Sequence, residues 1–314
     1  MRSIPFLAFS FIVCFLCINC KSSVQETKPI KKSALDHKLV LAQWSFNKEL
    51  FANEMNTFDF IREASEMGFA GVEFVNQFFI DKIEDTTYFD SLSIISKQVG
   101  IKNTLLMIDR AGNLGASNKE EREAAVLEHK KWMLAAAHLG CPNIRVNAHG
   151  DGSSDEVFEA CKTSIAQLLI WGKQRKVGVL IENHGGYSSD GDWLLKLVDE
   201  LKPHGVSSLA DFDNWCIERE NGELWGAPCI KEYDRYLGVK QLLPSAKSVS
   251  VKAFDFDDNG LPIKTDFVKM FKLIQESGYD GYLAVEFEGH NIDAKKGILK
   301  TKALAEKFIN EMSD

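Results

Sequence analysis

Acidic side chains follow three apolar segments of the sequence, each at the point where a strand would end. The segments are residues 177–187 (VGVLIENHGGY), 207–214 (SSLADFDN) and 282–290 (YLAVEFEGH). An ionised carboxylate in an apolar strand is costly unless a cation or hydrogen-bond donors compensate it. We therefore expect Glu182, Asp211 and Glu286 to lie at the mouths of their strands, each with a partner. Acids that converge in this way could bind a metal ion and transfer protons.

The prediction of a metal rests on the number of these carboxylates. Acids crowded into one mouth raise each other's pKa unless a divalent cation or a lysine offsets their charge. We predict that Glu182, Asp211 and Glu286 bind a divalent metal ion. Oxygen-rich ligation with at most one imidazole favours Mn²⁺, with Mg²⁺, Co²⁺ and Zn²⁺ as alternatives. The competing interpretation is that Lys252, Arg145 and backbone amides satisfy the acids without a metal.

Other polar residues share the side of the strand on which the acids lie. Residues i, i+2 and i+4 of a strand point to the same side, so an inward Glu182 brings His184 with it. The segment NIRVNAHGD offers Arg145 and His149 in one parity, and SVSVK offers Lys252. The residues that we expect to contact a substrate are Glu73, Arg145, His149, His184 and Lys252.

Repeated strand-and-helix units would position these residues. From Leu39 onward, short apolar runs alternate with longer helical patterns, as is typical of βα units. Strand starts are predicted near Leu39, Gly71, Ile101, Pro142, Val177, Val206, Lys247 and Tyr282. Their mean spacing of about 35 residues suits one βα unit each, and eight units make a closed (β/α)8 TIM barrel of the α/β class. No G-x-G-x-x-G turn follows the first strand, which argues against an open doubly wound sheet.

The lengths of the connections indicate which end of the barrel carries the site. Short turns from helix to strand are predicted at Gly68, Gly100, Gly140, Gly205 and Gly278. The longest connections, residues 110–118 and 212–233, instead follow strands. The long, irregular loops are therefore expected at the carboxyl face of the barrel, where barrel enzymes have their active sites.

The first forty residues differ from the rest of the chain. Arg2 precedes an apolar run over residues 4–18, in the order typical of a secretory signal. The sequence CINCKSS resembles a bacterial lipoprotein signal in which Cys20 is lipidated; a plain cleaved signal and an uncleaved anchor are the alternatives. We therefore expect a signal (1–20), a flexible tether (21–38) and one barrel domain (39–314). The expected location is the periplasmic side of a membrane, reached only through the lipid anchor.

Charge and cysteine content bear on the partners. The chain carries a net charge of −8 although residues 1–38 are basic, so the barrel is acidic and nucleic acid is not an expected partner. Outside the signal the sequence contains Cys141, Cys161, Cys216 and Cys229, with no C-x-x-C pair. Cys216 and Cys229 could pair in an oxidising periplasm; the alternative is two separate buried thiols.

Six short motifs follow one another along the barrel. They are LAQWSF, GVEF, RVNAHG, IENHGG, DFDN and VEFEG, beginning at residues 41, 71, 145, 181, 211 and 285. Their order and spacing resemble the sugar phosphate isomerase/epimerase family with its xylose-isomerase-like barrel. The resemblance implies a divalent metal held by a Glu, an Asp, a His and a second Glu, which places Glu182, Asp211 and Glu286 among the ligands. The family commonly has its His two residues before a Lys; this chain reads SVSVK, with Ser250 in place of the His, so water, substrate or His184 would complete the metal's ligands.

The function that this resemblance implies is a metal-dependent isomerase or epimerase of a small-molecule sugar or glycoside. Glu182 and Glu286 are the predicted catalytic residues: one removes a proton next to a carbonyl, and the other returns it after an enediolate has formed. Candidates for stacking on a sugar ring, or for lining the mouth, are Trp44, Phe78 and Trp215.

Two other functions would use the same site. A lyase would eliminate the aglycone from a keto-glycoside through the same enolate, and a non-catalytic sugar-binding lipoprotein would only hold the ligand. A role in nucleic-acid repair fits least, because the barrel is acidic and offers few histidine ligands.

Overall fold

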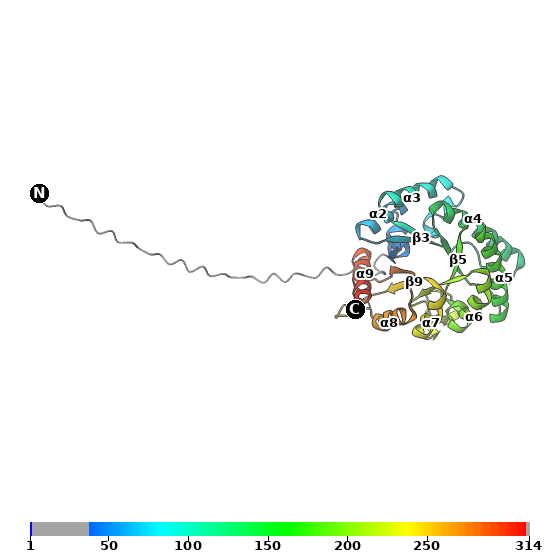
Figure 1. The fold of residues 1–314 in the computed structure, drawn as a ribbon. Coiled ribbons are helices and arrows are strands. Elements are labelled where there is room, and N and C mark those ends of the chain that lie inside the picture. The colour runs from blue at the N-terminus through cyan, green and yellow to red at the C-terminus, as the bar shows by residue number, and fades with distance from the viewer. Residues whose placement is uncertain (2–37, 312–314) are drawn as a thin grey trace. The chain divides into compact units, whose positions relative to one another are not determined.

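A closed barrel of parallel strands forms the centre of the molecule, with helices around it (Figure 1). The computed structural model describes Met1 and residues 38–311. Within residues 38–311 the strand order around the barrel is β1-β10-β9-β6-β5-β4-β3-β2, and β1 closes the ring by pairing with β10. The barrel strands are β1 (Leu39–Ala42), β2 (Gly71–Val75), β3 (Lys102–Met107), β4 (Asn143–Asn147), β5 (Gly178–Glu182), β6 (Ser207–Asp211), β9 (Ala246–Ala253) and β10 (Tyr282–Phe287).

The predicted (β/α)8 barrel is therefore confirmed. Each of the predicted strand starts lies within one residue of an observed strand start. The predicted lipoprotein signal (1–20) and almost all of the tether (21–38) lie outside the described residues. Between Lys38 and Glu311, the structure contains no helix that is both long enough and apolar enough to cross a membrane.

The helices begin and end where the local sequence provides caps. Ser153 accepts a hydrogen bond from the backbone of Glu156, whose side chain bonds back to Ser153, so a capping box opens α5. The five glycines predicted at the helix-to-strand turns all adopt positive φ, a conformation that costs glycine little. The helices are α1 (Asn47–Phe51), α2 (Thr57–Glu66), α3 (Thr86–Gln98), α4 (Lys119–Leu139), α5 (Ser154–Lys173), α6 (Gly191–Leu201), α7 (Arg235–Leu242), α8 (Phe267–Ser277) and α9 (Ala294–Glu311).

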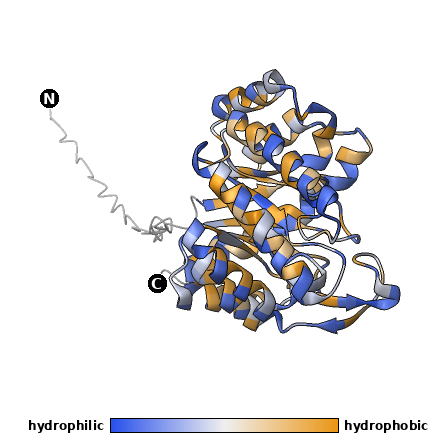
Figure 2. Ribbon diagram, turned by 90° about the vertical axis from the view of Figure 1, so that its right-hand side faces the viewer, coloured by the Kyte–Doolittle hydropathy of each residue, from blue (hydrophilic) through white to orange (hydrophobic). Residues whose placement is uncertain are grey.

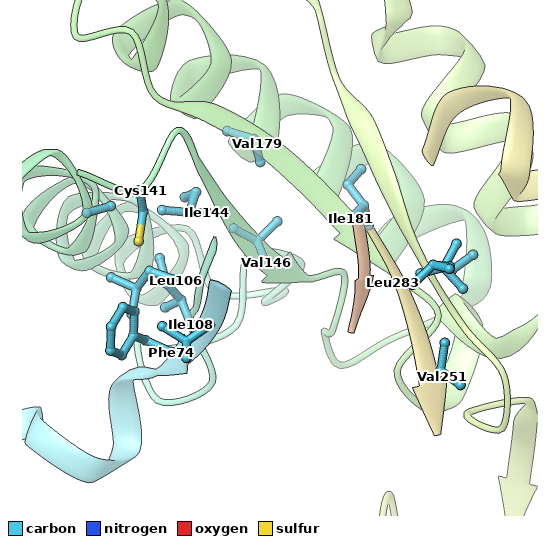
Figure 3. Close-up of a cluster of buried hydrophobic side chains, with 14 of the residues drawn as sticks. Phe74, Leu106, Ile108, Cys141, Ile144, Val146, Val179, Ile181, Val251 and Leu283 are labelled. Atoms are coloured by element: carbon cyan, nitrogen blue, oxygen red, sulfur yellow. The ribbon is translucent and has the colours of Figure 1, made fainter. Parts of the chain in front are cut away.

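Two clusters of buried apolar residues stabilise the barrel and the helices around it. The larger one lies between the strands and the helices, where Val179 and Ile181 of β5 pack beside Ile144 and Val146 of β4 (Figure 3). Apolar residues accordingly concentrate on the strands and on the helix faces that cover them (Figure 2). The smaller cluster is formed by Ala42, Val75, Leu105, Met107, Leu180 and Leu209. Leu180 shares the inward parity of Glu182, so this apolar layer fills the barrel interior beside the acids.

The long connection after β6 contains a hairpin that the sequence did not predict. Its antiparallel strands are β7 (Cys216–Arg219) and β8 (Cys229–Glu232). A disulfide joins Cys216 to Cys229 across the hairpin, whereas Cys141 and Cys161 are free and buried. The alternative of two separate buried thiols at Cys216 and Cys229 is therefore wrong.

The disulfide should control the order of the hairpin rather than the stability of the barrel. All four residues of β8 are exposed, and a two-stranded hairpin is marginally stable by itself. In the Cys216→Ser/Cys229→Ser variant we expect tryptic cleavage after Lys231 to accelerate by about tenfold or more, because local opening becomes easier. Mass spectrometry of a digestion time course measures this rate. Cleavage after exposed Arg175, outside the hairpin, should not change and provides the internal control. If Lys231 were cleaved at the same rate in the wild type and the variant, the disulfide would not control the order of the hairpin.

Candidate active site

A cavity of about 520 Å³ lies where the barrel strands end, and predicted site residues line it. Those that line the cavity are Arg145, His149, Glu182, His184, Lys252 and Glu286. Asp211 and Glu73 are fully buried and are not part of the lining. The convergence of acids and bases predicted from strand parity is therefore observed for most of the set, at the carboxyl face of the barrel.

Strand register determines which of these residues are neighbours. Glu286 of β10 lies beside Lys252 of β9, and Asp211 at the end of β6 lies beside Ser250 of the same strand β9. Glu182 is the last residue of β5 and pairs with Asn147 of β4. Since β9 stands between β6 and β10, its lysine reaches acids on both sides.

The side chain of Lys252 lies among carboxylates. Its Nζ is 2.9 Å from Glu288 Oε1, 3.3 Å from Asp211 Oδ2 and 3.5 Å from Glu286 Oε1. It also donates to the amide oxygen of Asn214 at 3.4 Å. Only 4% of Lys252 is exposed. Burial acts to lower its pKa, but Asp211, Glu286 and Glu288 outweigh burial and hold that pKa well above the ordinary value, so the side chain is an ammonium ion.

Arg145 compensates the acids on the other side of the cavity. Its Nε lies 2.6 Å from Glu182 Oε2, and its Nη1 contacts Asp109, the residue that follows β3 by two positions. Nη1 also donates to Asn147 Oδ1 at 3.0 Å. Because Arg145 is 3% exposed, this buried ion pair orders the β3, β4 and β5 ends of the barrel together.

The remaining oxygens of the central acids have donors of their own. Asp211 Oδ1 accepts backbone hydrogen bonds from Asp213 at 2.7 Å and from Asn214 at 2.9 Å. Ser250 donates its hydroxyl to Glu286 Oε2 at 2.9 Å. Glu286 is thus held from one side by Ser250 and from the other by Lys252.

The arrangement does not fit the predicted divalent metal. Asp211 and Glu286 turn toward Lys252, and Glu182 turns toward Arg145, instead of sharing one ion. In the described part of the chain, no group of three His, Cys, Asp or Glu side chains is arranged to hold a metal ion. Ser250 stands where the family resemblance predicts a histidine ligand, and its hydroxyl is already donated to Glu286. The competing interpretation, in which Lys252 and Arg145 satisfy the acids, agrees with this geometry.

Burial sets the protonation of the two predicted catalytic acids. It raises the pKa of Glu182 above the ordinary value even though Arg145 acts in the opposite direction. It raises the pKa of Glu286 in the same way, against the effect of Lys252. Raised pKa values bring carboxyl groups closer to neutral pH, where one can be an acid while the other is a base.

The imidazoles of His149 and His184 form one wall of the cavity. Their rings are stacked with centroids 5.8 Å apart, and His149 Nε2 lies 2.6 Å from the carbonyl oxygen of His184. Burial first, and then Arg145, hold the pKa of His184 well below its ordinary value, so this ring is neutral. Its Nδ1 is shielded from solvent and has no hydrogen-bond partner among the described residues.

The tip of the disulfide hairpin closes part of the same wall. Trp225 packs on His184 with ring centroids 4.6 Å apart, and both residues line the cavity. A Cβ atom at Gly185 would come within 3.1 Å of Leu224 and Trp225, and the φ of Gly185 is +88°. The first glycine of the IENHGG motif therefore allows the hairpin to approach the site.

Glu73, predicted to contact a substrate, lies outside the cavity lining. It lies in the middle of β2, is completely buried, and accepts a hydrogen bond from Ser248 of β9 inside the barrel. Both Glu73 and Glu182 point into the barrel. Glu182 is the last residue of β5 and therefore reaches the mouth, whereas Glu73 is in the middle of β2 and lies deeper. Burial raises the pKa of Glu73 to about 7, although the hydrogen bond from Ser248 lowers it.

Sequence reasoning missed several residues of the cavity. Asp109 follows the apolar run LLMI, the same pattern that identified Glu182, so a signal for it existed. Trp225 belongs to a hairpin with no periodic pattern, and nothing in the sequence marked it. Among the predicted aromatic residues, Trp44 lines the cavity and packs against Phe78, whereas Trp215 is buried beneath the hairpin, with its ring 5.9 Å from that of Tyr233.

The sequence of the barrel matches a known protein family. Residues 61–308 match the family described as the xylose isomerase-like TIM barrel. No curated protein sequence matches the chain.

Solved structures with the same fold include sugar epimerases. The E. coli 3-keto-D-glucoside 4-epimerase has 17% sequence identity and a TM-score of 0.66, over 86% of this chain and 99% of that one. An L-ribulose 3-epimerase has 12% identity and a TM-score of 0.67, over 88% and 95% of the two chains. The IOLI protein, crystallised with a bound zinc atom, has 13% identity and a TM-score of 0.63, over 87% and 98%. At these identities the likeness establishes the fold alone.

The buried position of Glu73 gives a prediction about stability. Its pKa is raised from 4.5 to about 7 on folding, so the unfolded chain releases this proton first, and stability falls as the pH rises from 4.5 through 7. The isosteric Glu73→Gln variant lacks this penalty. Its free energy of unfolding should therefore rise relative to the wild type by about 3 kcal/mol between pH 4.5 and pH 8.

Urea denaturation at several pH values measures this difference. The exposed residue Glu54 provides the matched control, because Glu54→Gln should show no such pH-dependent gain. A Glu73→Gln variant whose relative stability did not change with pH would mean that Glu73 is not held in a desolvated site.

Proposed function

Because the chain belongs to the xylose isomerase-like TIM barrel family, we propose that it isomerises or epimerises a sugar by moving a proton at a carbon next to a carbonyl. The observation that carries this proposal is the pair of buried carboxyl groups, Glu182 and Glu286, which line one cavity. Their strands, β5 and β10, are separated in the barrel by β6 and β9. Sugar epimerases among the structural neighbours support the substrate class, although their low identity supports it only through the fold.

The proposed reaction uses the two carboxyl groups in turn. The ionised one takes a proton from the carbon beside the carbonyl, and the C–H electron pair moves into the bond between the two carbons. The carbonyl oxygen then carries negative charge. In an epimerisation, the other carboxyl group, protonated from the start, delivers its proton to the opposite face of the same carbon, and the carbonyl re-forms. In an isomerisation, a proton is delivered to the former carbonyl carbon while the hydroxyl proton of the neighbouring carbon moves to the negative oxygen, so that the carbonyl re-forms on that neighbouring carbon. The two groups have exchanged roles at the end, and exchange with water restores them.

The basic residues around the cavity would stabilise the charge that develops on the substrate oxygen. Lys252 and Arg145 are buried and already oriented by carboxylates, so they need little reorganisation during the reaction. The neutral ring of His184 lines the cavity and can contact the sugar. No step in this mechanism passes through a metal ion, because the donor set does not fit one.

A second cavity favours a lyase as the second candidate. It has a volume of about 440 Å³ and shares Asn113, His149 and Leu224 with the first cavity. A glycoside could place its sugar ring among the carboxyl groups and its aglycone in the second cavity, beside Tyr187. Loss of the aglycone from the enolate of a keto-glycoside would then replace the return of the proton.

We also propose that the protein is exported and lipidated at Cys20. The disulfide between Cys216 and Cys229 supports export, because disulfides persist in oxidising compartments. Radiolabelled palmitate should enter the wild-type protein in cells and should not enter a Cys20→Ala variant. Labelling of both proteins would remove Cys20 as the acylated residue.

Solvent deuterium exchange tests the proposed isomerase. Purified protein should exchange a substrate C–H proton in a panel of aldoses, ketoses and 3-keto-glycosides, as followed by NMR. Glu286→Gln and Glu182→Gln should each slow this exchange by about 10²- to 10⁴-fold, the usual contribution of a general acid or base. Glu276→Gln, at an exposed position of α8, should leave the rate unchanged.

The same experiment separates the candidate functions. An epimerised or isomerised sugar supports the first, and free aglycone released from a 3-keto-glycoside supports the lyase. If a sugar raises the melting temperature but no member of the panel exchanges, the barrel is a sugar-binding protein and the proposed enzyme activity is wrong.

A further inference from the structure

The surroundings of Lys252 resemble those of a bound cation. We use the name ammonium site for Lys252 together with Asp211, Glu286 and Glu288. Four oxygen atoms lie around Nζ at 2.9–3.5 Å: one from each of these carboxylates and one from the Asn214 amide. These are hydrogen-bond distances, longer than the 2.0–2.6 Å or so at which oxygen atoms bind divalent metals. The positive charge at the centre is thus covalently part of the chain.

The backbone keeps this charge in place. Lys252 sits within β9, which pairs with β6 on one side and β10 on the other. In that register Lys252 is directly beside Glu286, and the outward side chains Val251 and Ala253 are buried against the helices. The backbone of Lys252 is therefore fixed beside the acids by the buried packing of its own strand.

Ser250 removes a metal ligand from the site, whereas Lys252 stands at the position where the family resemblance places a lysine. A histidine at this position would add an acceptor nitrogen suited to a metal, but serine donates a proton to Glu286 Oε2. One oxygen of Glu286 then accepts a hydrogen bond from Ser250, and the other forms an ion pair with Lys252. Glu182 forms an ion pair with Arg145. A divalent ion would have to compete with all three donors and would be repelled by the ammonium ion beside it.

We propose that the ammonium group of Lys252 replaces a divalent metal in this barrel, so that the site binds no metal ion and uses Lys252 to stabilise the negative oxygen of the reaction intermediate. The second half of this statement rests on the proposed isomerase function; the first half does not. Under this proposal Lys252 is a catalytic residue, since it lines the cavity in which the sugar would bind.

Metal content and thermal stability test the first half without any substrate. The full chain is dialysed against Mn²⁺, Zn²⁺ or Co²⁺, desalted and measured by elemental analysis, and its melting temperature is recorded with EDTA and with each metal. We expect far less than one metal atom per chain and the same melting temperature in every buffer. One tightly bound metal per chain, lost together with stability in EDTA, would overturn the proposal.

The Lys252→Met variant tests whether the lysine is the replacement. It leaves Asp211, Glu286 and Glu288 without their cation, so its melting temperature should fall by about 5 °C or more. Millimolar Mn²⁺ should restore part of that loss, because binding to the folded state stabilises it. Lys272→Met, at an exposed lysine of α8, is the control and should respond to neither. A Lys252→Met protein that Mn²⁺ does not stabilise counts against the proposal, and if this variant fails to fold, the wild-type measurements decide.

Exchange activity tests the second half. The wild-type rate should be the same with and without EDTA, and Lys252→Met should lower it by about 100-fold or more, as for loss of an oxyanion donor. Activity that requires added Mn²⁺ would contradict the role given to Lys252. If the wild type shows no exchange with any sugar, the proposed function fails, while the metal measurements still decide the nature of the site.

Discussion

The compensation of buried carboxylates by Lys252 and Arg145 is the interaction on which the site depends. Glu182, Asp211 and Glu286 lie at or near the ends of barrel strands and are almost completely shielded from water. Without cations within ion-pair distance, such groups would be protonated or would destabilise the fold. Lys252 and Arg145 allow the barrel to keep anionic oxygens at the edge of an apolar interior, and the geometry of the cavity follows from where these two side chains can reach.

An internal cation imposes constraints that a metal ion does not. An ammonium ion carries a single charge and donates directed hydrogen bonds, whereas a divalent ion attracts more strongly and accepts several ligands in a fixed geometry. A lysine cannot dissociate, so the site exists as soon as the chain folds. Burial raises the pKa of Glu286, and the single charge of Lys252 beside it acts in the opposite direction.

Strand parity predicts the side of the barrel that a residue faces but not its depth or its partner. Glu182 and Lys252 line the cavity as parity predicts, because a period of two is fixed by the geometry of any strand. Glu73 has the same inward parity but lies below the cavity, since depth depends on where a strand begins relative to its neighbours. The sequence motifs also suggested a metal, because acids from separate strands look the same whether their shared partner is an ion or a lysine. Ser250 was the only residue of that pattern that pointed toward the lysine.

The disulfide hairpin shows how a segment without regular pattern can still be fixed. Neither strand of the hairpin is long, and β8 is fully exposed, so burial contributes little to its order. The bond between Cys216 and Cys229 joins the first residue of β7 to the first residue of β8, diagonally across the hairpin, while Arg219 donates to the carbonyl oxygens of Leu224 and Ala227 near the tip. Trp225 is thereby presented to His184, and Gly185 leaves room for it. One wall of the cavity is therefore set by a cross-link and a glycine, neither of which belongs to the barrel's own core.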